Sequence, residues 1–402
     1  MRAALSGQRE RAVDEAMSEA PGDASARLYV EELKLTNFRN YERAGVSLDE
    51  RPVVLVGDNG AGKTNLLEAV SLLGPGQGLR GRDYGELARK DGPGGWAVAA
   101  TVISLEGVVE IGTGFGLAGP SEGTGRSVRI AGKDQSAGAL AHYVQLVWVI
   151  PEMDGLFTGP ASERRRFLDR LMLAIDPKMS GPRGRYDRAM RQRNRLFQMR
   201  EGSPSLFAGL EEQMAEAGVA MAAARLDAVA RLSALIQATY EARGPGPFPF
   251  AVLSLEGTLE RALMERPAVE VEDDYVSLLS ETRERDRLAG RALAGPHLSD
   301  LIVVHGPHNA PAGDCSSGEQ KALLLGLVLA KVRLIRELSG AAPLVLLDEV
   351  AAHLDGARRE ALFDEILDLK AQAWMTGTDR ATFASLSSQA QILAVNRGRI
   401  SA

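Results

Sequence analysis

A glycine-rich octapeptide that directly follows a short apolar segment constrains this chain more than any other feature. The apolar segment spans residues 53–56, and the octapeptide is Gly57, Asp58, Asn59, Gly60, Ala61, Gly62, Lys63 and Thr64. Its spacing is that of a Walker A loop, whose backbone N–H groups surround phosphate oxygens between a strand and a helix. Lys63 would reach the β and γ phosphates, and the Thr64 hydroxyl would bind Mg²⁺. The sequence therefore predicts an α/β nucleotide-binding domain that uses ATP and Mg²⁺.

A second motif near the carboxyl end supplies the acidic partner of such a loop. Four aliphatic residues, 344–347, precede Asp348 and Glu349. This is the pattern of a Walker B strand, in which Asp348 holds Mg²⁺ and Glu349 polarises the attacking water. Read alone, the segment is equally compatible with a strand that ends in two solvated acids. The Walker A loop earlier in the chain favours the catalytic interpretation, with Lys63, Asp348 and Glu349 as the catalytic residues.

Between the two Walker motifs lies a segment that resembles the signature loop of ATP-binding-cassette ATPases. Residues 316–320 read Ser-Ser-Gly-Glu-Gln and open a predicted helix over 321–338. Helix capping by Ser316 would by itself explain the serine and Glu319. The motif order favours a functional role, because a D-loop-like segment with Asp355 follows Walker B. The resemblance implies a homodimer formed with ATP, in which Ser316 and Gly318 close over the γ phosphate held by a second chain.

The charge distribution points to a polyanion partner. The formal net charge is −6, yet residues 163–200 contain twelve Lys or Arg and only four acids. Arg188, Arg191 and Arg195 share one helix face by their spacing, which fits phosphate contact but also an ordinary solvated face. Arg164 and Arg165 are further candidate DNA contacts, although they could equally brace an arm against the ATPase head, and Arg80 is a weaker one.

Several classes of protein are disfavoured by composition. No apolar stretch reaches the length of a membrane span, so no membrane partner is expected. Cys315 is the single cysteine, which rules out an internal disulfide and a CxxC zinc site and fits a cytoplasmic location. The five histidines are not expected to form a metal cluster. His305 and His308 flank a predicted hairpin turn, and Cys315 is expected to act as a small hydrophobic residue before the signature serine.

Five segments together resemble the RecF family of bacterial recombination and repair ATPases. They are residues 33–41 (LKLTNFRNY), 57–69, 151–152 with 162–169 (SERRRFLD), 186–194 (YDRAMRQRN) and 295–301 (GPHLSDL). Within and beside them we assign Arg39, Asn40 and Asn65 to nucleotide binding. The resemblance also implies a Q-loop glutamine near Mg²⁺, for which Gln145 is the candidate, and a switch residue, for which Thr378 replaces the cassette histidine. Ser299 stands where the family usually has a second acid, leaving Asp300.

The resemblance implies a fold, a set of partners and a function. The expected fold is an ABC/SMC-type P-loop ATPase head, a mixed β-sheet with helices, carrying an inserted and mainly helical arm. We expect a mobile extension over 1–27, head segments over 28–157 and 295–402, and the arm over 158–294. The implied function is a slow, DNA-stimulated ATPase that clamps duplex, gapped or junction DNA. Its implied partners are RecR- and RecO-type mediators that help load recombinase.

Two other functions remain open at this point. One is a transporter-type nucleotide-binding subunit, which the long helical insert and the missing switch histidine oppose. The other is an SMC-like structural tether on DNA that binds ATP without useful turnover. The moderate insert lacks the heptad coiled coils of SMC proteins and the CxxC hook of Rad50-like proteins.

Overall fold

The Walker A loop lies in the middle of a six-stranded sheet, here called the P-loop sheet. The computed structural model describes residues 27–116, 125–199 and 201–401, so the extension predicted over 1–27 lies outside the described residues except for Arg27. The strand order is β15-β14-β3-β13-β12-β8, and all pairs are parallel except β14 with β15. The strands are β3 (Val53–Val56), β8 (Leu146–Val149), β12 (Leu344–Leu347), β13 (Ala373–Gly377), β14 (Gln391–Asn396) and β15 (Arg399–Ser401).

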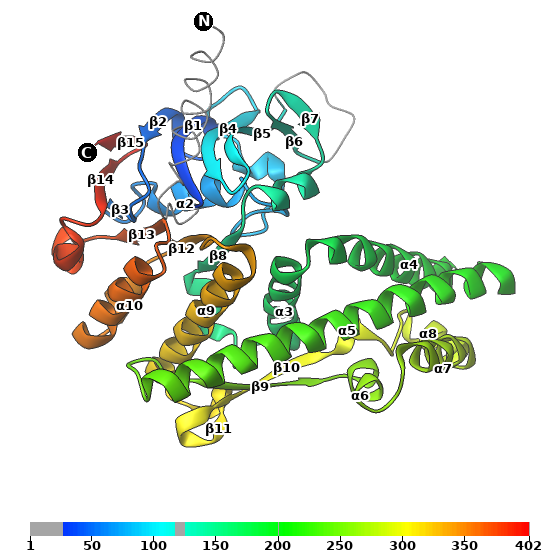
Figure 1. Ribbon diagram of the computed structural model, residues 1–402. Coiled ribbons are helices and arrows are strands. Elements are labelled where there is room, and N and C mark those ends of the chain that lie inside the picture. Colours follow the sequence, from blue (N-terminus) through cyan, green and yellow to red (C-terminus); the bar gives the residue numbers. More distant parts are fainter. Residues whose placement is uncertain (1–26, 117–124, 200, 402) are drawn as a thin grey trace, which may run out of the picture.

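Helices cover the P-loop sheet, which explains why its central strands are apolar throughout. Every residue of β12 and β13 is buried, as expected for parallel strands that are covered on both faces. The nearest helices are α2 (Lys63–Ser71), α9 (Ser317–Ser339) and α10 (Gly356–Asp368). In Figure 1, β3, β12 and β13 lie side by side with α2 above them and with α9 and α10 below.

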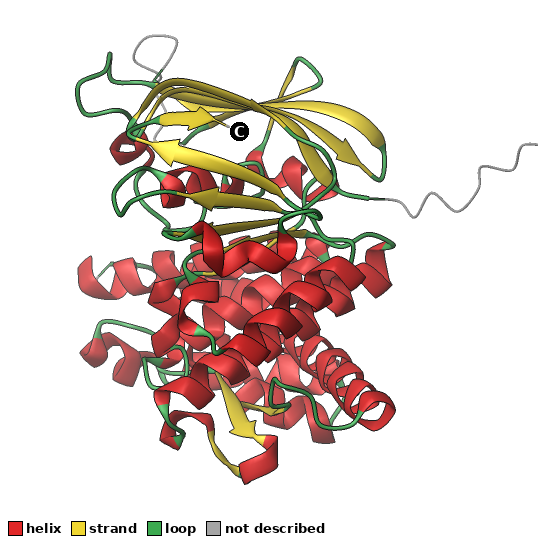
Figure 2. Ribbon diagram, turned by 90° about the vertical axis from the view of Figure 1, so that its left-hand side faces the viewer, coloured by secondary structure: helices red, strands yellow, loops and turns green. Residues whose placement is uncertain are grey.

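A second, antiparallel sheet forms the outer layer of the head. Its order is β2-β1-β4-β5-β6-β7, and Figure 2 shows it on the side of the P-loop sheet opposite to the long helices. Buried and more exposed residues alternate over 98–105 and 108–112, and both segments form strands of this sheet, whose inward residues are buried. The strands are β1 (Tyr29–Phe38), β2 (Tyr41–Ser47), β4 (Trp96–Ser104), β5 (Gly107–Phe115), β6 (Ser127–Ile130) and β7 (Lys133–Gln135).

The insert is mainly helical, as predicted, and one helix dominates it. α5 runs unbroken for 40 residues until Gly244, which has a positive φ of 70°. Residues in its first half, such as Met214, pack in a separate arm core, whereas Leu232 and Ile236 belong to the head core. The helices are α3 (Ala161–Ile175), α4 (Ser180–Met199), α5 (Pro204–Arg243), α6 (Thr258–Glu265), α7 (Ala268–Glu281) and α8 (Arg283–Ala289).

A small third sheet crosses the predicted boundary between arm and head. β9 (Ala251–Glu256) pairs antiparallel with β10 (Asp300–His305), which also pairs with β11 (Ala310–Pro311). A division at residues 294 and 295 would cut this sheet in two. Helical periodicity could not reveal a pairing between strands that lie about 45 residues apart in the chain. Arm and head therefore share both a sheet and the helix α5.

Short 3₁₀ helices complete the described chain. They are η1 (Tyr84–Leu87), η2 (Ala137–His142), η3 (Pro151–Gly155), η4 (Pro177–Met179), η5 (Pro296–Leu298), η6 (Gly306–His308), η7 (Ala312–Asp314), η8 (Val350–His353) and η9 (Arg380–Leu386). Within the described ranges, no helix combines the length and the apolar character that crossing a bilayer would require.

Candidate functional site

The Walker A loop connects β3 to α2 at the carboxyl edge of the P-loop sheet. Two of its glycines are required by close backbone approach. A Cβ on Gly57 would lie 2.1 Å from the Val395 carbonyl oxygen. A Cβ on Gly62, whose φ is 118°, would lie 2.5 Å from Asn40 Nδ2 and 2.8 Å from the Tyr41 hydroxyl. Only glycine fits these positions, so the spacing read from the sequence has a direct steric cause.

The turn between β1 and β2 holds the loop from outside. Asn40 Nδ2 donates to the Ala61 carbonyl at 3.1 Å, and the Tyr41 hydroxyl donates to the Gly62 carbonyl at 3.0 Å. Asn65 Nδ2 donates to Asn40 Oδ1 at 2.8 Å. The structure thus brings together Asn40, Asn65 and the octapeptide, which lie in separate segments of the sequence.

Arg39, predicted to contact the nucleotide, is engaged with the P-loop helix. Its Nε and Nη2 donate to the two carboxylate oxygens of Glu68, at 2.7 and 3.0 Å, and Glu68 is buried within α2. Arg80 approaches the same carboxylate at 3.9 Å. In this structure Arg39 braces α2, because a bidentate arginine–carboxylate pair fixes both partners. Direct contact with a nucleotide would require Arg39 to leave Glu68.

Lys63 occupies the cradle that phosphates would fill. Its Nζ donates to the carbonyl oxygens of Gly57 at 2.6 Å and of Asp58 at 2.9 Å, and the side chain is buried. These two carbonyls are the hydrogen-bond acceptors of the ammonium group. A triphosphate would offer anionic acceptors in their stead, which form stronger hydrogen bonds with an ammonium group.

The oxygens of Thr64 and Asp348 have the spacing of two Mg²⁺ ligands. Thr64 Oγ1 lies 3.0 Å from Asp348 Oδ1, although 284 positions separate the residues. Adjacent oxygens in an octahedral Mg²⁺ site lie about 2.9 Å apart, given metal–oxygen distances of about 2.0–2.1 Å. Burial raises the pKa of Asp348, while hydrogen bonds from Thr376 and Thr64 oppose that rise. These residues fit the metal, which would stabilise the ionised carboxylate further.

Thr376, which was not predicted, joins the two Walker B acids. Its Oγ1 donates to Asp348 Oδ1 at 2.8 Å and accepts the Glu349 backbone N–H at 2.8 Å. Glu349 itself has a left-handed backbone, with φ 57°, which is rare and strained for a residue with a side chain. Thr378, the predicted switch residue, is exposed two positions later. The hydroxyl that touches Walker B therefore lies within β13, whereas the predicted one lies just beyond its last residue, Gly377.

Replacing Thr376 with valine should reduce ATP turnover by about 10- to 100-fold, as loss of an outer-shell partner of a metal site commonly does. The change keeps the shape of the buried side chain but removes the hydroxyl from Asp348 and Glu349. Steady-state hydrolysis at several Mg²⁺ concentrations would measure it. Thr378→Val is the matched control on the exposed neighbour and should leave turnover near wild type. Equal loss in both variants would return the switch role to Thr378.

The assignment of Gln145 to the metal site is wrong. Leu146, the first residue of β8, pairs in parallel register with Leu344, the first residue of β12. Gln145 therefore lies at the amino edge of the sheet, whereas Asp348 follows β12 at the carboxyl edge. Four strand residues separate these edges by about 13 Å. Glu152, in η3 directly after β8, is at the correct edge.

The signature segment begins α9 at a distance from the Walker A loop of its own chain. Figure 1 shows α9 running from beside β11 up to the P-loop sheet, with its first residues at the end away from α2. Ser316 caps the helix and is exposed, and apart from its chain neighbours and the backbone of α9, no described heavy atom lies within 4 Å of a Cβ built on Gly318. Asp355 caps α10 through the Arg358 N–H at 2.9 Å and is 56% exposed. Both segments are open to a second molecule.

Comparison with known proteins identifies the family. The model of the RecF/RecN/SMC N terminal domain matches residues 29–401. The chain is 52% identical over 369 residues to a DNA replication and repair protein RecF of Rhizobium johnstonii, covering 92% of this chain and 97% of that protein. It is 51% identical over 376 residues to the protein of the same name from Mesorhizobium japonicum, covering 93% and 98%. The chain belongs to the RecF family.

Solved structures of RecF confirm the fold. The structure of the recombination mediator protein RecF with ATP in the RecFOR pathway has a TM-score of 0.80 and 22% identity, covering 94% of this chain and 99% of that one. The α/β ABC/SMC-type head with an inserted helical arm is thus confirmed. RecF membership includes the arm, so it removes the transporter-type subunit from consideration.

The RecF-like motifs outside the nucleotide site meet where arm and head join. Arg164 donates through Nε and Nη2 to both oxygens of Asp300, each at 2.8 Å, and through Nη1 to the Leu156 and Gly159 carbonyls. Arg165 donates to the Ser299 carbonyl at 2.9 Å. Arg225 of α5 bridges Asp169 and the Pro296 carbonyl. The guanidinium of Arg164 is fully engaged, so its assignment as a DNA contact is replaced by the bracing role.

On α4, the predicted arginine face is confirmed, but one arginine of the basic block was misjudged. Arg188, Arg191 and Arg195 are all exposed. Arg193, counted with them, is completely buried: its Nε lies 3.0 Å from Glu211 Oε1 and its Nη1 lies 2.7 Å from Asp286 Oδ2. A buried cation needs such partners, and both lie far along the chain. Sequence spacing around Arg193 gave no sign of them.

Two of the five histidines, which were not expected to form a metal cluster, lie close together in the fold. The β10–β11 connection brings donor atoms of His305, His308 and Cys315 within 4.8 Å of one another. The predicted hairpin turn is present as η6. Cys315 is half-exposed and not packed as a core residue.

Proposed function

We propose that this RecF chain is a Mg²⁺-dependent ATPase that closes as an ATP-joined dimer on DNA during replication and recombinational repair. The observation that carries the proposal is the 3.0 Å contact between Thr64 and Asp348, with Glu349 held beside them by Thr376. The carboxyl edge of the P-loop sheet thus holds the Walker A lysine, two oxygens suited to Mg²⁺ and a candidate general base. The chemistry such a group can perform is phosphoryl transfer to water.

Each side chain has a definite part in hydrolysis. Lys63 exchanges the Gly57 and Asp58 carbonyls for phosphate oxygens and balances their charge. Thr64 and Asp348 would hold Mg²⁺, which supplies further positive charge to the β and γ phosphates. Glu349 accepts a proton from the attacking water. Thr376 accepts the Glu349 backbone N–H and so helps to hold the strained, left-handed backbone of Glu349.

The second half of each site comes from another copy of the chain. Ser316 and Gly318 lie on an exposed helix start that one chain does not bring to its own Walker A loop. In the free chain Ser316 Oγ donates to Glu319 Oε2 at 2.6 Å. Docking on a γ phosphate would take over that hydroxyl and add the positive end of the α9 dipole. Asp355 would lie on the same two-fold seam.

We propose that the ATP-joined dimer closes on DNA. Arg188, Arg191 and Arg195 form one exposed basic face of α4, and Arg80 lies exposed after the P-loop helix. These residues suit phosphate contacts, which position a protein on DNA without reading its sequence. Gapped or junction DNA is the proposed substrate, with RecO- and RecR-type mediators as partners in recombinase loading. The names of the RecF relatives, which refer to replication, repair and the RecFOR pathway, support this role.

A mixing experiment tests the composite site. Lys63→Met disables one chain's Walker A loop, and Ser316→Arg blocks one chain's signature. Each variant alone should be almost inactive, because both of its sites are damaged. Only a heterodimer contains an intact site, in which the Ser316→Arg chain supplies the Walker A loop and the Lys63→Met chain supplies the signature. The mixture should therefore hydrolyse ATP well above either variant alone, up to roughly a quarter of the wild-type rate per chain, the value for random pairing.

The matched control mixes Lys63→Met with Glu349→Gln. Both changes damage the Walker side, so no heterodimer of this pair contains an intact site and turnover should stay at background. Two results would contradict the proposal: no recovery in the Lys63→Met and Ser316→Arg mixture, or full turnover by Ser316→Arg alone.

A further inference from the structure

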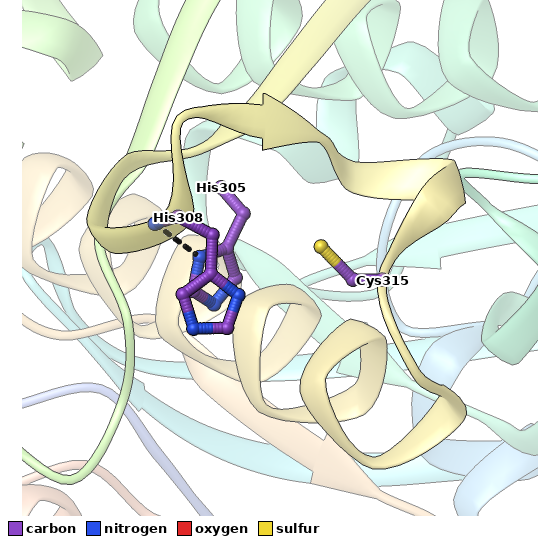
Figure 3. Close-up of side chains that lie close together, drawn as sticks. All are labelled: His305, His308 and Cys315. Atoms are coloured by element: carbon purple, nitrogen blue, oxygen red, sulfur yellow. Dashed lines mark hydrogen bonds between the residues drawn. The ribbon is translucent and has the colours of Figure 1, made fainter.

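Two histidines and the single cysteine converge immediately before the signature helix. His305 ends β10, His308 ends η6, and Cys315 follows η7. Figure 3 shows the two imidazole rings side by side with the Cys315 sulfur pointing toward them. One donor atom from each residue lies within 4.8 Å of the other two.

The local fold holds this arrangement in place. Antiparallel pairing of β10 with β11 returns the chain across a tight turn at Gly306 and Pro307, and Asn309 takes a left-handed φ of 46°. His305 is buried and accepts the His308 backbone N–H at 3.3 Å, and the two ring centres lie 4.2 Å apart. The Cys315 Sγ lies 3.7 Å from the Pro311 carbonyl oxygen. Backbone pairing, rather than side-chain packing alone, therefore sets the cluster.

The donor set is one that a borderline-soft metal ion prefers. Two imidazoles and a thiolate suit Zn²⁺, whereas Mg²⁺ and Ca²⁺ prefer oxygen ligands. Neighbouring donors around tetrahedral Zn²⁺ lie about 3.3–3.6 Å apart, given zinc–nitrogen and zinc–sulfur distances of about 2.0–2.3 Å. To bind one Zn²⁺ ion, the donor atoms of the three residues would have to move about 1 Å closer together. His308 is 52% exposed and Cys315 is half-exposed, so both can make that movement against the buried His305.

A carboxylate backs the cluster and links it to the signature serine. Glu319 Oε1 lies 3.4 Å from His308 Nδ1, which leaves Nε2 of that ring as the donor for a metal. Carboxylate–histidine pairs of this kind orient metal-binding rings. The other carboxylate oxygen of Glu319 accepts the Ser316 N–H at 2.8 Å and the Ser316 hydroxyl at 2.6 Å. A single side chain thus touches both the cluster and the signature serine.

We propose that His305, His308 and Cys315 form a Zn²⁺ site with three protein ligands and one open position, with Glu319 orienting His308. The site is separate from the Mg²⁺ position at Thr64 and Asp348, and it does not depend on the proposed ATPase cycle. Its place beside Ser316 means that metal occupancy would stiffen the β10–α9 connection from which the signature segment begins.

Metal titration of the purified full-length chain tests the proposal. After chelator treatment, calorimetry with Zn²⁺ should give one bound ion per chain. Co²⁺ as a spectroscopic probe should produce a thiolate-to-metal charge-transfer band in the near ultraviolet, which reports the Cys315 sulfur directly. Cys315→Ser should abolish the band, and His308→Ala should weaken Zn²⁺ binding at least about 10-fold.

Matched variants separate the site from adventitious binding. His142→Ala removes an exposed histidine outside the cluster and should leave stoichiometry, affinity and the Co²⁺ band unchanged. Thermal unfolding without metal should be similar for Cys315→Ser, His308→Ala and wild type, since neither side chain is fully buried. Absence of Zn²⁺ binding by the wild-type chain, or binding and a Co²⁺ band that survive in Cys315→Ser, would overturn the proposal.

Discussion

The Glu349→Gln variant is expected to hydrolyse ATP about 10²–10⁴ times more slowly than the wild-type chain while still forming the ATP-bound dimer. The amide keeps the size of the side chain but cannot accept a proton from water. Lys63, Thr64, Asp348 and Thr376 keep their contacts, so nucleotide and metal binding are retained. Stopped turnover should therefore trap the closed state on DNA.

Single-turnover hydrolysis would measure the loss of ATPase activity, and light scattering with ATP would measure dimerisation. Binding to a gapped DNA duplex would measure retention on DNA. Lys63→Met is the comparison variant and should neither dimerise nor stay on DNA. In the Glu349→Gln background, alanine at Arg188, Arg191 and Arg195 should reduce the magnitude of the slope of log K against log salt concentration by about 2–3. Each lost phosphate contact accounts for about 0.9 of that slope. A Glu349→Gln chain that stays monomeric with ATP and DNA, or that hydrolyses ATP normally, would contradict the assigned role.

The second large effect is on stability, at the centre of the arm. Arg193→Ala should lower the free energy of unfolding by about 3–5 kcal/mol, because it leaves two buried carboxylates without their shared cation. The guanidinium of Arg193 contacts Glu211, Asp286 and the Leu279 carbonyl oxygen, all within 3.0 Å. Glu211 retains its pair with Arg283 at the edge, whereas Asp286 keeps only backbone N–H partners such as Leu293.

Urea unfolding followed by circular dichroism would measure the loss. Arg195→Ala, two residues later on the exposed face of the same helix, is the control and should change stability by less than about 0.5 kcal/mol. If the two variants were equally stable, the buried network of Arg193 would not hold the arm together.

Motifs that depend on neighbours in the chain were predictable from the sequence, since their geometry is local. The glycines of the Walker A loop and the capping pair of Ser316 and Glu319 belong to this group, and each is found where its spacing placed it. The alternating strands of the outer sheet and the end of α5 at Gly244 were predictable for the same reason.

Features that depend on register or on distant partners were not predictable. Gln145 and Thr378 were each chosen from the right segment. The parallel register of β8 with β12 places Gln145 at the edge of the sheet opposite to Asp348. β13 ends at Gly377, so Thr376, and not Thr378, is the strand hydroxyl that reaches Asp348. Burial of Arg193 requires acids 18 and 93 positions away. His305 and Cys315 meet because β10 and β11 pair, which their ten-residue separation does not reveal.

The length of α5 has a mechanical consequence. At about 1.5 Å per residue, its 40 residues make a rod of about 60 Å, anchored at one end in the arm core and at the other in the head core. Its head end packs against α9, the helix that begins with the signature segment. A load placed on the arm, such as a bent DNA duplex, would therefore be transmitted by one unbroken helix to the surface proposed to form the dimer.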